Sequence, residues 1–300
     1  MDFGWWNPGL SLGGLVAGVM VGLTGMGGAA LVTPMLVLLF GVSPTAAVSS
    51  DVVASAIMKP VGSIVHIRHR TVHWRLVMWL SIGSVPGVLV GTWLFAKYAT
   101  GPGMDSTIKT WIGIVLLIAL VAMVARTFVG ARATRIAGVQ ELLGPTSPVK
   151  IAPTVILGLV VGVVVGMTSV GSGSLVVTCL LLLYPLLRPS VLVGTDLTQA
   201  VPMLIAGAIA HAGLGTVDWI ILASLLIGQI PGVWIGSRMS SRYDGHALKW
   251  LLMVLLLAIS MRLLGAPSLL AAGVAIGGVT VVVVLIVVEW VKKRKAAALA

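Results

Sequence analysis

Three charged residues of this sequence lie inside long apolar segments, where charge is unusual. Lys59 lies well inside the apolar segment 45–66, and Asp51 and Asp196 lie near the beginnings of two such segments. An ionisable residue inside a membrane segment is costly and is by default a candidate functional residue. Lys59 is therefore a candidate counter-charge for a negatively charged solute. The two acids are candidates for taking up and releasing protons.

Each of these residues also has a structural interpretation. Lys59 could pair with Asp51, or its side chain could extend toward the membrane surface. The separation of Lys59 and Asp51 in the sequence corresponds to about 12 Å along a helix, which disfavours a direct pair. The sequences Ser49-Ser50-Asp51 and Gly194-Thr195-Asp196 resemble helix-capping sequences. Both acids could therefore satisfy backbone amides at helix N-termini instead.

Two stretches rich in small residues interrupt apolar runs, and we call them the first break (24–28) and the second break (168–174). Each precedes an apolar half-helix, whose free backbone amides and dipole attract anions. Glycine lets the backbone approach a ligand closely. Gln199, on the helix after Asp196, is plausible polar lining. The candidate substrate-binding residues are Thr24, Gly25, Gly27, Gly28, Lys59, Thr168, Ser169, Gly171, Ser172, Gly173, Ser174 and Gln199.

Small residues can alternatively serve close helix packing. We favour that interpretation for six glycines spaced by four, which are Gly14, Gly18, Gly22, Gly158, Gly162 and Gly166.

The two breaks belong to an internal repeat. About 145 residues after Asp51, His66 and Trp74 come Asp196, His211 and Trp219. Duplicated halves in a membrane chain are typical of secondary transporters, which place the substrate site where the repeats meet. Because His66 and His211 also repeat, they join Asp51 and Asp196 as candidate proton-coupling residues.

The composition predicts an all-α polytopic membrane protein. Apolar residues make up 58% of the chain and charged residues 9%, far from the values of a soluble domain. The apolar runs 76–96, 108–125, 246–264 and 268–291 are each long enough to cross a hydrocarbon layer of about 30 Å. The net charge of +11 does not indicate a nucleic-acid partner, because the basic residues lie between the hydrophobic runs. No catalytic, cofactor-binding or nucleotide-binding motif is visible, so we expect neither an enzyme nor direct use of ATP.

The distribution of basic residues predicts the orientation. Loops 66–75, 126–150 and 237–249 and the tail 292–295 are basic, which places them in the cytoplasm and the N-terminus outside, across a bacterial inner membrane. The counterpart of loop 66–75, residues 211–218, has no Lys or Arg. The halves are therefore expected to be inverted repeats, each beginning with a broken-helix or re-entrant hairpin.

We expect the first membrane repeat at 1–127, a cytoplasmic linker at 128–150, the second repeat at 151–264, and a C-terminal helix with a basic tail at 265–300. The expected partners are a small anionic substrate, the lipid bilayer and a second copy of the chain in a homodimer.

Two other functions stay open. His66, His69 and His73 could bind a divalent metal together with Asp51, but three arginines lie among these histidines and would repel the cation. We therefore expect no metal site, and a divalent-metal permease is the alternative. A membrane scaffold subunit that transports nothing is the second alternative.

The glycine-rich run from Gly14 to Gly28, followed by Pro34, Pro44 and Ala47, resembles the opening of the sulfite exporter TauE/SafE (TSUP) permeases. Segment 211–219 and the pairs Pro86-Gly87 and Pro231-Gly232 are similar too. This resemblance covers about residues 10–260. It implies a permease for small sulfur-containing or organic anions, such as sulfite or sulfonates, that works without ATP. The second break departs from the first, with Ser169, Ser172 and Ser174 where the first half has Gly25, Gly28 and Ala30.

Overall fold

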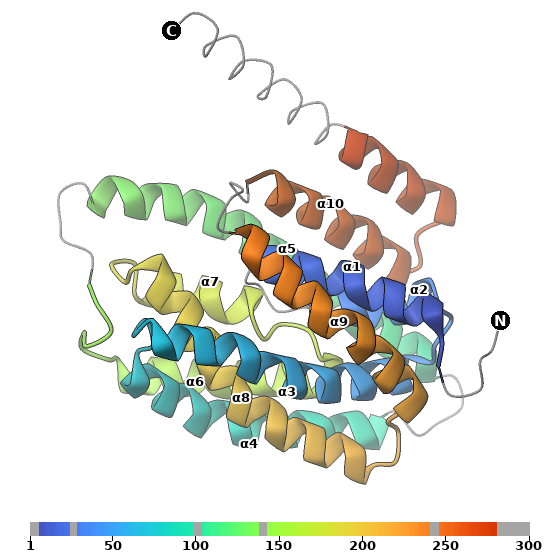
Figure 1. Cartoon of the computed structure of the whole chain (residues 1–300), viewed down its shortest axis with the longest axis horizontal. Helices are drawn as coiled ribbons and strands as arrows, with labels where there is room; N and C mark the ends of the chain where they lie inside the picture. The colour runs from blue at the N-terminus through green and yellow to red at the C-terminus, as the bar shows by residue number, and fades with distance from the viewer. Residues whose placement is uncertain (1–5, 25–28, 99–103, 138–142, 241–245, 281–300) are drawn as a thin grey trace, which may run out of the picture.

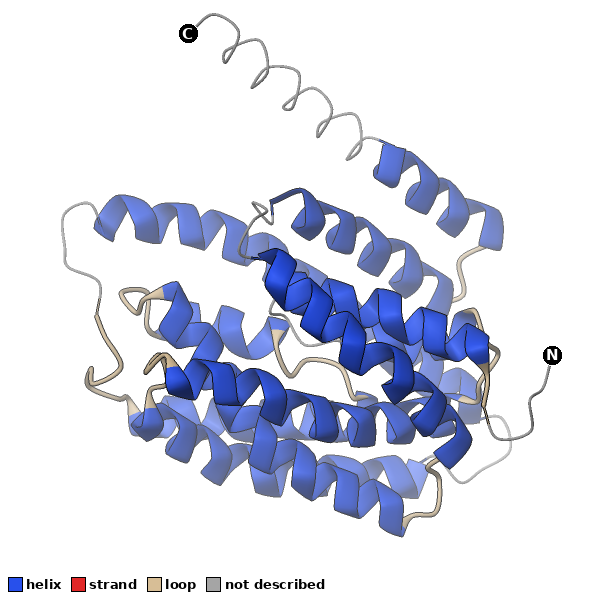
Figure 2. Ribbon diagram, in the orientation of Figure 1, coloured by secondary structure: helices blue, strands red, loops and turns tan. Residues whose placement is uncertain are grey.

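The computed structural model describes residues 6–24, 29–98, 104–137, 143–240 and 246–280, and these form helices without any strand (Figure 2). Six of the helices are long and apolar enough to cross a membrane. The all-α polytopic fold predicted from composition is therefore confirmed.

The helices of the two halves follow the same order (Figure 1). The first half contains α1 (Pro8–Thr24), α2 (Ala29–Leu38), α3 (Pro44–Arg68), α4 (Trp74–Tyr98) and α5 (Met104–Ala137). The second contains α6 (Ile151–Thr168), α7 (Ser174–Leu183), α8 (Pro189–Gly213), α9 (Trp219–Ser240) and α10 (His246–Leu263). A further apolar helix covers Ser268–Thr280. The inverted orientation of the two halves stays a prediction.

The second half begins with an interrupted helical segment, as the sequence predicted, because α6 ends at Thr168 and α7 begins at Ser174; most of the first break lies outside the described residues. The short members α2 and α7 have ten residues each, and ten helical residues extend only about 15 Å, half of a hydrocarbon core. The long helices that follow them begin at proline. Ser43 caps α3 by accepting a hydrogen bond from the amide of Ala46, and Pro189 begins α8. Proline suits the first position of a helix because its missing N–H is not needed there.

The halves are intertwined through their glycines. Helix α1 packs along α9, and α6 packs along α4. A side chain on Gly14 or Gly18 would collide with the α9 backbone at Leu225 or Gln229. Glycines 158, 162 and 166 meet the α4 backbone in the same way. The packing interpretation of these five glycines is confirmed, and no contact is described for Gly22.

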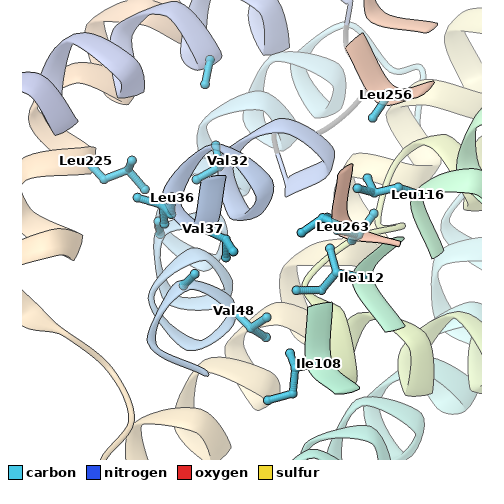
Figure 3. Packing of buried hydrophobic residues seen from close by; sticks show 14 of the residues in the cluster. Val32, Leu36, Val37, Val48, Ile108, Ile112, Leu116, Leu225, Leu256 and Leu263 are labelled. Atoms are coloured by element: carbon cyan, nitrogen blue, oxygen red, sulfur yellow. The ribbon is translucent and has the colours of Figure 1, made fainter. Parts of the chain in front are cut away.

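Two apolar clusters form the interior. The first cluster joins α1, α2, α5, α9 and α10, and residues such as Leu36, Ile112 and Leu263 meet in it (Figure 3). The second joins α4, α6, α7 and α8. Helix α3 contributes Val48 to the first cluster and Val52 to the second. Helices α3 and α8 also pack against each other. The helices that carry Asp51, Lys59 and Asp196 are therefore central.

The glycine contacts predict that Gly162→Leu destabilises the protein. An added side chain would collide with the carbonyl of Ser84 on α4, and overpacking of this kind costs about 1–3 kcal/mol. We expect a clearly lower Tm for the purified variant in detergent. Gly277→Leu is the matched control, because nothing lies within 4 Å of the position its Cβ would take. Equal Tm values for both variants would contradict the role of these glycines.

Candidate functional site

Asp51 connects three elements in the interior. Its Oδ2 accepts hydrogen bonds from Thr33 Oγ1 on α2 at 2.6 Å and from Ser169 Oγ in the second break at 3.0 Å. Its Oδ1 is buried and has no partner among the described residues. Asp51 therefore ties the second break to the first half of the chain and keeps one carboxylate oxygen unengaged.

The capping interpretation of the two acids is wrong. Helix α3 begins at Pro44 and α8 at Pro189, so Asp51 and Asp196 each lie seven residues beyond the first residue of their helices. The free backbone amides are confined to the first turn. Both side chains are also buried, with 1% and 0% of their surface exposed. These carboxylates lie in the interior of the bundle and do not serve helix ends.

Lys59 also reaches the second break. Its ammonium donates a hydrogen bond to the carbonyl of Ser172, and only 5% of the side chain surface is exposed. Asp51 bonds to the same break, and Ser63, one turn after Lys59 on α3, donates to Thr198 Oγ1 at 3.0 Å, two residues after Asp196 on α8. One buried cation therefore lies near two buried acids, one from each half of the chain.

The second break is buried and irregular. Helix α6 ends where Ser169 takes a left-handed conformation with φ of 60°, which is uncommon for a residue other than glycine. The hydroxyl of Thr168 supports this turn by accepting from the amide of Val170 at 3.2 Å. Gly171, with φ of 116°, continues the turn. The hydroxyl of Ser172 is buried and has no partner among the described residues.

Gln199 adds an amide to the same neighbourhood. It lies one turn after Asp196 on α8, and its Oε1 accepts from Ser84 Oγ on α4 at 3.3 Å. Its Nε2 is buried and has no partner among the described residues. The Ser172 hydroxyl in the second break and the Gln199 amide nitrogen on α8 are therefore two buried groups that can donate a hydrogen bond and have no described acceptor.

The structure does not place every predicted site residue. Gly25, Gly27 and Gly28 lie outside the described residues, and the side chains of Thr24 and Ser174 are not described. Thr168, Ser169, Gly171, Ser172 and Gly173 lie together in the buried second break.

Sequence reasoning missed Thr33, which is fully buried and bonded to Asp51. A signal was present, because Thr33 and Thr178 are separated by the same interval as Asp51 and Asp196.

The two repeated histidines have different surroundings. His211 Nε2 lies 3.0 Å from the carbonyl oxygen of Gly166, which can only accept, so this nitrogen donates. Its Nδ1 lies 3.0 Å from Ser49 Oγ. His211 is buried beside Phe95, whereas His66 is partly exposed and contacts Thr71. Because fifteen helical residues separate His211 from Asp196, they lie about 22 Å apart along α8.

The histidines of loop 66–75 do not form a metal site in the described structure. His73 is buried, and its Nε2 lies 2.9 Å from the carbonyl oxygen of Ser147, while His69 is exposed. No group of three or more His, Cys, Asp or Glu residues that could hold a metal ion occurs among the described residues. The divalent-metal alternative therefore has no ligand set in that part of the chain.

Comparisons with known proteins show membrane transporters among the relatives of this chain. Probable membrane transporter protein YjnA of Bacillus subtilis is 36% identical over 252 residues, which cover 84% of this chain and 97% of the relative. YunE of the same organism, with the same description, is 25% identical over 84% of this chain and 93% of its own length. No solved structure matches the chain.

The model of the family described as "Sulfite exporter TauE/SafE" matches residues 10–263, and the described residues include six candidate membrane spans. This chain is therefore a multi-pass membrane protein that belongs to the sulfite exporter TauE/SafE family of membrane transporters.

Proposed function

We propose that this protein is a proton-coupled permease that moves small sulfur-containing or organic anions, such as sulfite or sulfonates, across the bacterial inner membrane. The observation that carries the proposal is the buried ammonium of Lys59, held at the carbonyl of Ser172 in the second break. The N-terminus lies outside and the C-terminus in the cytoplasm, as the basic loops predict. The protein catalyses no reaction.

The groups around Lys59 suit an oxyanion. An ammonium has three N–H donors, and the only hydrogen bond described for this one uses a single donor. The hydroxyl of Ser172, the residue whose carbonyl Lys59 contacts, adds a buried donor without a described partner, and α8 carries another on the amide of Gln199. Several donors around one buried positive charge are the complement of a small anion with several oxygens, because charge-assisted hydrogen bonds are the strong ones.

Alternating access follows from the packing. The glycine contacts make α1 with α9, and α4 with α6, into units that each contain both halves of the sequence. Val170 in the second break belongs to the first cluster, whereas Val165 of α6 belongs to the second. We infer that the site lies at this boundary between the two units, because secondary transporters place their substrate where two such parts meet.

Lys59→Met tests whether the buried ammonium of Lys59 is required for anion transport. The variant keeps an apolar chain of similar length and removes the positive charge, so we expect uptake of radiolabelled sulfite into proteoliposomes to fall at least tenfold. Lys97→Met is the control, because Lys97 is exposed and lies over the ring of Trp93. Wild-type uptake by a well-folded Lys59→Met protein, as judged by its Tm and elution profile, would reject the role of Lys59.

Asp51→Asn tests proton coupling. The amide oxygen of asparagine can still accept from Thr33 and Ser169, so the local fold is preserved while the titratable group is lost. We expect anion uptake driven by an inward proton gradient to fall at least tenfold, while exchange of internal for external anion continues. Asp105→Asn, at an exposed position of α5, should leave both assays unchanged. Gradient-driven uptake at the wild-type rate in Asp51→Asn would exclude this acid as a required proton carrier and leave Asp196 in that role.

A further inference from the structure

The charges around Lys59 restrict which anions the site can accept. Lys59, Asp51 and Asp196 are all buried. Lys59 and Asp51 both bond to the second break, and the neighbouring parts of α3 and α8 are joined by the hydrogen bond from Ser63 Oγ to Thr198 Oγ1 at 3.0 Å. With all three groups ionised, one positive and two negative charges leave a net charge of −1. An uncompensated charge in a low-dielectric interior is costly, so the group that can neutralise it does so. The favoured empty state therefore holds one proton on the acid pair.

The surroundings contain no other described charge that changes this balance. On the helices packed against α3 and α8, the charged residues whose side chains are described lie near helix ends and are mostly exposed; they are Arg75 and Lys97 of α4 and Asp105 and Lys109 of α5. Helices α2, α6 and α9 have no charged residue among their described side chains. The single thiol of α7, Cys179, is neutral when protonated. His211, far from Asp196 along α8, donates to the carbonyl of Gly166 on α6, and His73 Nε2 lies 2.9 Å from the carbonyl oxygen of Ser147.

A bound anion changes the charge count by its own valence. When a monovalent anion binds, the total charge of the anion, Lys59 and the two acids becomes −1. One further proton on the remaining carboxylate restores neutrality. A divalent anion brings it to −2, but only one carboxylate is left to protonate, so a net negative charge persists. The unengaged Oδ1 of Asp51 is a place where such a proton can reside, because Oδ2 is already occupied by Thr33 and Ser169.

We propose that this site selects monovalent oxyanions over divalent ones and takes up one proton with each anion, so that transport is electroneutral. The proposal rests on the proposed function and specifies its substrate class, which is a singly charged head group such as a sulfonate. The second, independent observation is the buried Ser172 hydroxyl beside the ammonium, which has no described partner and can donate to that head group. The balance is one anion and one proton in, with no net charge moved.

Methanesulfonate and sulfate are the probes, since both present sulfonyl oxygens and differ in charge. Calorimetric titration of the purified protein in two buffers of different ionisation enthalpy measures the protons taken up per anion bound. We expect about one proton with methanesulfonate and at least tenfold weaker binding of sulfate. Equal affinity for the two anions, or methanesulfonate binding without proton uptake, would overturn the inference while leaving the anion permease intact. Failure of both anions and of sulfite to bind would instead reject the proposed function.

Lys59→Met provides a second test. Without the ammonium, the neutral empty site holds a proton on each acid, so no carboxylate is left to take up a proton with the anion. Methanesulfonate should therefore bind at least tenfold more weakly and without proton uptake. Proton uptake by this variant equal to that of the unmodified protein would overturn the inference, and should the variant fail to fold, the two-buffer titration of the unmodified protein decides the proposal.

Discussion

A lysine ammonium inside an apolar bundle must be compensated, and the compensation of Lys59 organises the centre of this molecule. The Lys59 ammonium donates a hydrogen bond to the carbonyl of Ser172, which belongs to the other half of the chain. The buried acids Asp51 and Asp196 supply the opposite charge. Asp51 in turn holds Ser169 of the same break. The break cannot adopt an ordinary helical path without losing these bonds, so the interrupted backbone and the buried charges depend on each other.

The intertwined packing explains why this centre lies where it does. Close backbone contact at glycines joins α6 to α4 and α1 to α9, and each of these pairs combines one helix from each half. In a lipid environment, such contacts are a main source of helix association, because apolar side chains gain little by leaving lipid. The chain therefore has two packed units that do not coincide with its two sequence repeats. Helix α3 contributes to both units.

Much of this architecture could be predicted from the sequence, because local patterns determine it. The apolar runs located the long helices, and the glycine spacing predicted the close packing of Gly158 and Gly162. The bonds that define the site could not be predicted in this way. Thr33 and Ser169 reach Asp51 across 18 and 118 residues, and no periodicity encodes a partner at such a distance. The capping interpretation of Asp51 failed for a local reason, since Pro44 begins the helix earlier than the polar residues suggest.

The two halves of the chain share the same order of helices but differ in several of their polar residues. Asp51 and Asp196 are duplicated, but Lys59 is matched by Leu204, and Ser169 and Ser172 are matched by Gly25 and Gly28. These unmatched residues meet at a single place, between α3 and the second break. A site on an internal symmetry axis would present equivalent groups from both sides. Lys59 is the only buried lysine or arginine among the described side chains, so under the proposed function the anion binds with its charged end toward Lys59.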